Sequence, residues 1–587
     1  MVLTSRIALV LSLLFAVGCG DKAQDAADKA REVAGAAGEK AKVAGEKAID
    51  GARHAMAGAQ GGLAAVTAAA LLAPVPADTP YVMANLAPLP ADFSAKLGTA
   101  LDPLFKKLEA ELASEKGRLG DSPEDKLGKA VIEELEGNLS RAGMEKLGLD
   151  PDMRFVIYGL GLMPVMRIQL KDAATFKATI ARIEGKAGMK APTAKLGEQE
   201  YWLVQENGMT IAVGIVGNFL VAGVVPDATA PKALPLMFGQ AAPEQTASAA
   251  FMASAAKHGF KGFAGYIDAT LIAATVMGDA KGLAGEIFTA LSKGEAPQLP
   301  PVCKTEIGDM VAQFPRVAFG YTEISGQKVA ARYILETKPA LAQELKGLTN
   351  AVPGLGKDEG ALLAFGAAIN VQKALDFAKA KAKAIQAAPY QCPLLADFNA
   401  GMAGMAQGLD AAPIPPFVLG IRGFNVVVKD GKVGPAGPTN IRATAIFAAD
   451  KAPELFAMAK GMAPPLAALE VPADGKPVPF PAGLVPPVVE APHIAMNATG
   501  IAVSVGPGEE KGLTALLEAK ADGQSPVIAF TYDIKRFMAM FAEQMNQGMS
   551  ADEKMIFDST IGMLGVTRYA LDLQDAGIVV SQEVTLP

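Results

Sequence analysis

Residues 316–336 read RVAFGYTEISGQKVAARYILE, and this stretch decides the fold class. Most of its residues are β-branched, aromatic or small, and Ser325-Gly326 at its centre is typical of a tight turn between two strands. Two strands joined by so short a turn must be antiparallel, because a parallel pair needs a long crossover connection. The stretch therefore predicts an antiparallel β-meander.

Three more stretches of the chain are rich in β-branched and aromatic residues and resemble a β-meander in the same way. They are RFVIYGLGLMPVMRIQL from Arg154, PFVLGIRGFNVVVKDGKV from Pro416 and GVTRYALDLQDAGIVVSQEV from Gly565. Asp430-Gly431 and Asp575-Ala576-Gly577 are further hairpin turn signals within them. The meander is therefore an internal repeat with four copies.

Each meander follows an opening segment in which a strand runs into a helix. The four openings begin at Tyr81, Gly262, Ala361 and Pro526, and their strand-to-helix junctions hold Asn85, Asp268, Asn370 and Asp533. A short polar side chain at such a junction can accept hydrogen bonds from the first amides of the helix. We interpret these four residues as helix caps rather than as functional acids.

The four copies predict an α+β fold of antiparallel sheets flanked by helices. The first and third copies are longer, and each adds a helix and further strands, so the copies form two homologous halves, residues 77–350 and 359–587. A half of this length is an ordinary domain size. The glycine-rich stretch from Val352 is expected to be the linker between them.

The first 18 residues have the features of a secretory signal peptide. Arg6 supplies the positive start, an apolar run extends from Ile7 to Val17, and Gly18 is a small residue at the expected cleavage point. The apolar run is too short for a permanent span, because a hydrocarbon core of about 30 Å takes about 20 helical residues. We expect the segment to be removed.

The run FAVGC at residues 15–19 resembles the lipobox of bacterial lipoproteins. The resemblance implies that Cys19 receives diacylglycerol and a fatty acyl chain such as palmitate, which together form a membrane anchor. Ala16 differs from the leucine usual at that place. The alternative is an ordinary signal peptide that is cut nearby, with Cys19 lost or left free.

The resemblance also carries an expected location. Aspartate directly after the lipidated cysteine retains enteric lipoproteins in the inner membrane, and here that place is Gly20. The expected location is therefore the bacterial cell envelope, at the outer membrane, facing the periplasm or the cell surface.

Residues 19–76 are expected to be a stalk, either helical or disordered. Alanines recur at steps of three and four from Ala23 to Ala55, among balanced acids and bases. Alanine buries little apolar area, so this stripe is a weak packing surface. The stretch resembles Ala-Lys-Glu repeats of lipoprotein stalks; an amphipathic membrane helix is a less favoured reading, because the apolar face lacks large side chains.

Composition excludes several classes of function. The net charge is -7 and no basic tract is present, so the chain has no electrostatic footprint for nucleic acid. After Cys19 only Cys303 and Cys392 remain, and in an oxidising compartment such a pair favours a disulfide over two buried thiols. Neither cysteine has a histidine or a second cysteine nearby in sequence, so no metal site is expected.

No catalytic or cofactor motif is found in the sequence, and we expect a protein that is not an enzyme. The sequence contains no GxSxG, HExxH or GxxxxGK[ST] pattern, and the glycine-rich run from Gly506 to Gly512 is interpreted as a turn. Methionines gather at 401–409 and 537–549. They are interpreted as core residues, with a hydrophobic groove as the alternative.

Two functions of different class remain open. The chain resembles uncharacterised bacterial envelope lipoproteins of repeated α+β build, a resemblance that implies no activity. The first hypothesis is non-catalytic binding of a lipid or other apolar ligand in the periplasm. The second is a tethered scaffold or assembly factor that docks another envelope protein.

The anchor is tested by the substitution Cys19→Ser. Without the thiol no thioether can form, so the variant should lose incorporation of a labelled fatty acid and move from the membrane fraction to the soluble fraction. Equal labelling of the variant and the natural chain would contradict lipidation at Cys19. Gly20→Ala is the control, because it changes the neighbouring residue and keeps the thiol of Cys19.

Overall fold

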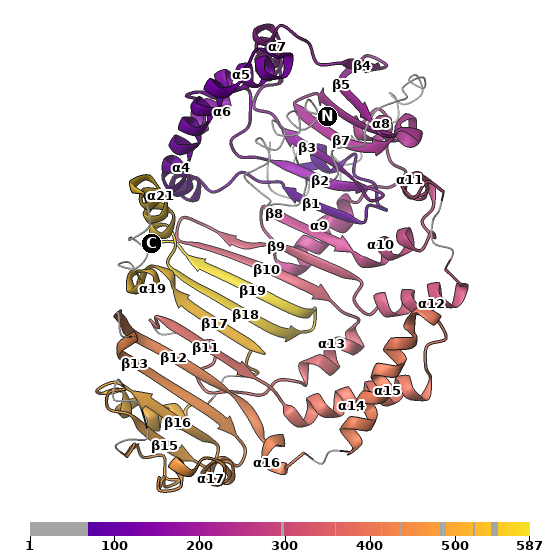
Figure 1. Cartoon of the computed structure of the whole chain (residues 1–587). Helices are drawn as coiled ribbons and strands as arrows, with labels where there is room; N and C mark the ends of the chain where they lie inside the picture. The colour runs from indigo at the N-terminus through magenta and orange to yellow at the C-terminus, as the bar shows by residue number, and fades with distance from the viewer. Residues whose placement is uncertain are drawn as a thin grey trace. The chain divides into compact units, whose positions relative to one another are not determined.

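The computed structural model describes residues 68–294, 299–357, 360–411, 414–434, 437–481, 485, 489–520, 523–541 and 550–587. The chain divides into two compact units. Within these ranges, the first unit comprises residues 68–299 together with 318–326, and the second comprises 300–317 and 327–587. Both units contain helices and antiparallel strands, as the α+β prediction requires (Figure 1).

The first unit has a sheet with the strand order β4-β5-β6-β7-β3-β2-β1-β8, in which every neighbouring pair is antiparallel. Its strands are β1 (Tyr81–Asn85), β2 (Phe155–Leu160), β3 (Met163–Gln169), β4 (Thr193–Leu196), β5 (Gln199–Glu206), β6 (Met209–Val216), β7 (Phe219–Pro226) and β8 (Phe263–Asp268). Strand β9 (Arg316–Ile324) belongs to this unit from Ala318 onward.

The helices of the first unit are α4 (Ala91–Arg118), α5 (Pro123–Leu135), α6 (Arg141–Lys146), α7 (Ala173–Ala187), α8 (Ala230–Met237), α9 (Ser248–His258), α10 (Ala269–Val276) and α11 (Gly282–Leu291), with a short 3-10 turn η1 (Asp227–Thr229). Side chains from α8, α9 and α11 pack on one face of the sheet and form the main core there. Helix α7 packs on the other face through Phe176, which lies in a small cluster with Leu170 and Ile215.

The second unit has the strand order β14-β15-β16-β13-β12-β11-β17-β18-β19-β10, again antiparallel throughout. Its strands are β10 (Lys328–Glu336), β11 (Leu363–Ala368), β12 (Ile421–Gly434), β13 (Gly437–Ala449), β14 (Val478–Pro479), β15 (His493–Asn497), β16 (Gly500–Val505), β17 (Ile528–Asp533), β18 (Val566–Gln574) and β19 (Gly577–Thr585).

The helices of the second unit are α12 (Pro301–Val311), α13 (Pro339–Lys346), α14 (Val371–Ala387), α15 (Ala396–Ala411), α16 (Pro416–Leu419), α17 (Ala452–Met462), α18 (Leu513–Glu518), α19 (Ile534–Met540) and α21 (Ala551–Gly562), with 3-10 turns η2 (Pro393–Leu395), η3 (Pro464–Leu466) and η4 (Glu509–Gly512). Figure 1 shows α19 and α21 at one end of the large sheet and α13 and α14 near the other. In that view no helix crosses the middle of β10, β19, β18 and β17.

Three of the four expected helix caps are present. Asp268 accepts from the amides of Thr270 and Leu271, and Asn370 and Asp533 each accept one amide of the following helix. Asn85 is not a cap, because five residues separate the end of β1 from the start of α4. Its amide nitrogen instead donates to the carbonyl oxygens of Asp152 and Met153.

One of the hairpin turns differs from the prediction. Strand β12 continues through Asp430-Gly431 to Gly434, with irregular register on either side of Asp430. The chain absorbs this turn signal as a β-bulge rather than a reversal. Asp575-Ala576 does form the β18–β19 turn, and Gly577 follows it with φ +126°. A Cβ there would lie 2.2 Å from the carbonyl oxygen of Leu335, so the position needs glycine.

Two segments expected to be connections are parts of the folded units. Residues 68–72, at the end of the predicted stalk, are helical, and Leu71, Leu72 and Val75 are fully buried in the core of the first unit. In the predicted linker, Val352 and Leu355 pack into a buried cluster of the second unit. Both segments are rich in Ala, Gly or Pro, yet each carries a few large apolar side chains that are buried on folding.

The boundary between the units also differs from the boundary between the sequence halves. Helix α12, strand β10 and helix α13 precede residue 350, but they lie in the second unit. Strand β10 pairs there along its whole length with β19, from Lys328 opposite Thr585 to Glu336 opposite Gly577. The sequence alone could not locate this boundary, because the partner strand is about 250 residues away in the chain.

The substitution Leu72→Ala tests where the folded body begins. Removing a fully buried leucine should destabilise the first unit by about 2–5 kcal/mol, because the transfer free energy is lost and a cavity remains. The free energy of unfolding in urea measures the effect. Leu104→Ala is the control, since Leu104 is 44% exposed and should change stability by less than about 0.5 kcal/mol. Equal effects of the two would place Leu72 outside the core.

Candidate functional site

The disulfide joins Cys303 and Cys392, the pair expected from the sequence, across a sequence separation of 89. Cys303 lies on α12, and Cys392 lies in the connection between α14 and α15. Both side chains are buried. Beside the bond, the carboxylate of Glu306 accepts hydrogen bonds from the amides of Gln391 and Cys392, each 2.8 Å long. Helix α12 is therefore fixed to the tip of the α14–α15 hairpin by a covalent bond and a carboxylate.

The position of this bond changes its expected role. By the sequence halves it would join one half to the other, because Cys303 precedes residue 350 and Cys392 follows residue 359. In the structure both cysteines lie in the second unit. The bond therefore stabilises that unit from within.

Cys19, the predicted lipidation site, lies outside the described residues, as do the signal peptide and most of the stalk. Among the described residues, no helix has the length and apolar character needed to span a membrane. Within the same ranges, no group of three histidine, cysteine or acidic side chains could hold a metal ion.

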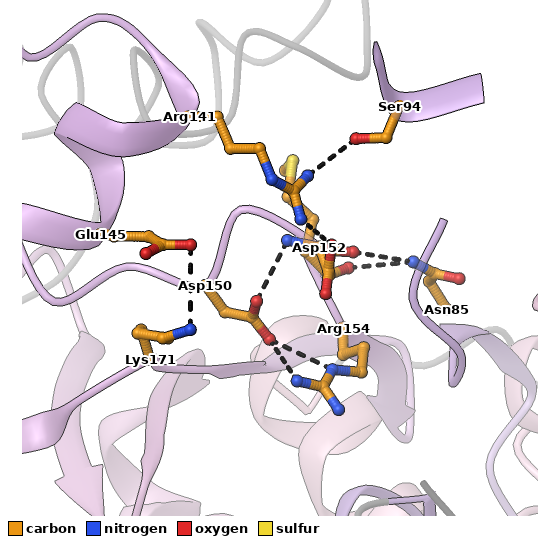
Figure 2. A network of polar contacts seen from close by, with 9 residues as sticks. Asn85, Ser94, Arg141, Glu145, Asp150, Asp152, Arg154 and Lys171 are labelled. Atoms are coloured by element: carbon orange, nitrogen blue, oxygen red, sulfur yellow. Dashed lines mark hydrogen bonds and ion pairs between the residues drawn. The ribbon is translucent and has the colours of Figure 1, made fainter. Parts of the chain in front are cut away.

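A polar network in the first unit joins helices α4 and α6 to the segment that precedes β2 (Figure 2). Arg154 donates through Nε and Nη2 to Oδ2 of Asp150, at 3.1 and 2.8 Å. Arg141 donates to the carboxylate of Asp152 and, at 2.8 Å, to the hydroxyl of Ser94 on α4. Each of these carboxylates is thus neutralised by an arginine. The network contains no nucleophile paired with a base, and we interpret it as a structural clamp.

The glycine-rich run from Gly506 is a turn, as interpreted from the sequence. It contains the 3-10 turn η4, and the carboxylate of Glu509 accepts from Lys429 at 2.6 Å and from Nε of Arg442 at 3.0 Å. Burial would raise the pKa of Glu509, but hydrogen bonds from these two cations outweigh it and lower the pKa. The nearby cations are therefore paired with Glu509, and the negative charge of this residue disfavours phosphate binding.

The second unit exposes a row of large apolar side chains on one face of its sheet. We call this the aromatic face; its members are Phe365, Phe424, Ile528, Phe530, Tyr569 and Tyr333. Phe365 on β11 lies opposite Phe530 on β17, which lies opposite Tyr569 on β18. The ring of Phe365 is 5.5 Å from that of Phe424 and 6.4 Å from that of Phe530. The row therefore runs across the neighbouring strands β12, β11, β17 and β18, and Tyr333 lies on β10, beyond β19.

Most members of the aromatic face are open to solvent. Phe365 is 41% exposed, Ile528 43%, Tyr569 36% and Tyr333 49%. The hydroxyl of Tyr569 accepts a hydrogen bond from Gln582 on the same face. Most exposed apolar side chains of a globular domain are scattered singly, and large contiguous apolar patches are typical of interaction sites.

The opposite face of the same strands has the reverse arrangement. Ala364 and Ala529 alternate with the aromatic residues along β11 and β17, and both are buried. An antiparallel sheet with one solvated face normally has its large apolar side chains inside and polar ones outside. Here the small residues are inside and the large ones outside, so packing of the unit does not account for the aromatic row.

The first unit has a smaller aromatic group. Phe263 on β8 lies 6.3 Å from Phe155, 6.0 Å from Phe319 and 5.6 Å from Tyr321, measured between ring centroids. These rings are partly exposed rather than buried. They contact one another across strands, as aromatic pairs on a sheet face do.

Two open clefts are found in the described part of the first unit. One, of about 560 Å³, is lined by α10, α11 and η1, and the other, of about 580 Å³, lies between α7 and the β4–β5 hairpin. Both exceed the roughly 300 Å³ at the lower end of small-molecule sites. The structure thus offers space for a ligand at its surface.

The sequence analysis missed the aromatic face, although a signal was present. LAFGAA and IAFTYD alternate large and small residues with a period of two, and the small ones could have identified the buried face. The prediction that the clustered methionines are core residues is only partly testable. Met405 on α15 is 45% exposed and so is not a core residue, and 542–549 lie outside the described ranges.

The chain was compared with known proteins by sequence and by structure. No family model, curated protein or solved structure matches it.

The double variant Cys303→Ser/Cys392→Ser tests what the disulfide contributes. On the chain-entropy model, loss of a crosslink that closes a loop of this length costs about 4.6 kcal/mol of unfolding free energy. Denaturant unfolding of the second unit should show this loss, and adding a reductant to the natural chain should reproduce it. Unchanged stability in both experiments would contradict a stabilising bond.

Proposed function

We propose that this protein is a non-catalytic, lipid-anchored envelope protein that binds a lipid or another apolar ligand on the aromatic face of its second unit. The observation that carries the proposal is the row Phe365, Phe530 and Tyr569 on adjacent strands. Phe365 and Tyr569 are exposed and Phe530 is partly exposed, while the small residues Ala364 and Ala529 occupy the buried face. Burial of such side chains by a ligand contributes about 1.5–3 kcal/mol each.

The proposal includes the location expected from the sequence. Acylation of Cys19 would hold the chain at the outer membrane, where apolar ligands are abundant, and the periplasm would supply the oxidising conditions for the Cys303–Cys392 bond. The presence of the disulfide supports the proposal that the protein resides in an oxidising compartment. The acyl anchor has its support in the FAVGC sequence.

We also propose that the body arose by duplication into two homologous halves of two βα-meander units each. The strand orders support it: β1, β2, β3, β7, β6, β5 and β8 of the first unit correspond in place to β11, β12, β13, β16, β15, β14 and β17 of the second. In each case the opening strand lies between its own meander and the next opening strand. Independent origins would not be expected to repeat this order.

The second candidate is a scaffold that docks another envelope protein. Its support is a separate group of exposed apolar side chains near the disulfide, namely Val302 at 37%, Leu394 at 67% and Phe398 at 40%. Here Cys303 and Cys392 are neighbours of Val302 and Leu394 in the chain, so the bond holds the two segments together. A protein partner could bury this group.

The aromatic face is tested with the apolar fluorophore N-phenyl-1-naphthylamine and a competing long-chain fatty acid. The natural chain should bind the fluorophore and release it to the fatty acid. The double variant Phe365→Thr/Phe530→Thr should bind about tenfold more weakly or less, since it removes two ring contacts but keeps β-forming residues.

The matched control is Phe314→Thr, which removes a phenylalanine of the same unit that is 38% exposed but lies outside the sheet. It should bind as the natural chain does. Equal binding by all three chains would contradict the proposal. A natural chain that binds no fluorophore but retains one envelope protein through Leu394 would favour the scaffold.

A further inference from the structure

The cleft between α7 and the β4–β5 hairpin of the first unit has an apolar floor. Trp202, the single tryptophan of the chain, lies there with Ile180 and Ile215. Trp202 and Ile180 are partly buried against the cluster that contains Ile215. One stripe of α7, at positions 177, 180, 181 and 184, lines the cleft over about two helical turns. The floor is thus a flat aromatic ring beside aliphatic side chains.

Charges of both signs line the same cleft. They come from Lys177 and Lys190, and from Glu184, Glu198 and Glu200. The carboxylate of Glu184 accepts a hydrogen bond from the amide of Ala191. For the other four, no opposite charge lies within 4.0 Å among the described residues.

The other charged residues of α7 show that this is a local feature. Facing α5, Arg182 donates to the carboxylate of Glu134 at 2.8 Å, and Lys186 lies 3.0 Å from the same carboxylate. That carboxylate has a lowered pKa because of the hydrogen bonds from Arg182 and Lys186, although burial opposes it. The helix pairs its charges where it meets protein, and leaves Lys177 unpaired where it lines the cleft.

We propose that this cleft binds a zwitterionic group made of an ammonium and a phosphate, such as phosphoethanolamine. An ammonium is attracted to the face of an indole ring, and Glu198 and Glu200 balance its charge. Lysine ammonium groups bind phosphate oxygens as point charges, and Lys177 and Lys190 supply two of them. A ligand of one sign would leave either the lysines or the glutamates unmatched.

The inference rests on the proposed function in naming a lipid head group as the natural source of this zwitterion. A free zwitterionic metabolite has the same chemistry. The two sources are distinguished by presenting the group in solution and in vesicles. The cleft and the aromatic face belong to different units, and each has its own optical reporter, so failure of one proposal does not conceal the other.

The test is a fluorescence titration of the full chain, in which all tryptophan emission comes from Trp202. Phosphoethanolamine should change the emission in a saturable way. Lys177→Met and Glu200→Gln should each raise the dissociation constant about tenfold, because each removes one charged partner of the ligand. Lys126→Met is the matched control, an exposed lysine of the same unit outside the cleft, and should leave binding unchanged.

Comparison ligands test the chemical class of the ligand and show whether it comes from a lipid head group or from a free metabolite. Inorganic phosphate alone and ethanolamine alone should bind at least tenfold more weakly, because each engages only one set of charges. A response to phosphatidylethanolamine vesicles and not to phosphatidylglycerol vesicles identifies the head group as the source, and a response to soluble phosphoethanolamine only identifies a metabolite. Three results would overturn the proposal. They are an affinity for inorganic phosphate equal to that for phosphoethanolamine, variants that bind as tightly as the natural chain, and no response to phosphoethanolamine in either form. If the natural chain does not bind the fluorophore but still responds to phosphoethanolamine, only the proposed function of the aromatic face is contradicted.

Discussion

The opening strand of the second unit is hydrogen-bonded along both edges, and the rest of that unit depends on this. Strand β11 pairs on one side with β12, which is near in sequence, and on the other side with β17, which follows after about 160 residues. Without β11 the β12–β13 meander and the β17–β18–β19 strands would have no shared backbone. Strand β1 has the same position in the first unit, between β2 and β8.

Strands added on both sides of a central strand can form a wide sheet. In such a sheet, helices need not cover the whole of each face. Tyr333 and Arg332 are neighbours on β10 and point to opposite faces, and both are exposed. At this position of β10 the strand is held by its backbone pairing with β19, whereas Ile334 beside it is buried. On β11 and β17 the buried face is occupied by small residues such as Ala364 and Ala529, and the large aromatic side chains lie on the other face.

Local structure followed from the sequence because its signals are local. Alternating β-branched residues, short turns and the caps at Asp268, Asn370 and Asp533 each involve residues a few places apart. The partner of β10, the buried state of Val352 and the separation of Asn85 from α4 depend on contacts with distant segments or on a loop conformation. Of the candidate site, the cysteine pair followed from composition. The aromatic face required knowing which side of β11 is buried.

The route of the chain has a consequence for how the molecule is made and cut. The polypeptide enters the second unit at residue 300, returns to the first at 318 and enters the second again at 327. A single cleavage at any point would leave at least one unit assembled from two fragments, because neither unit is one continuous segment of the chain. During synthesis, Cys303 emerges long before Cys392 and the strand partner of β10. The second unit can therefore be completed only after the last strand, β19, has been made.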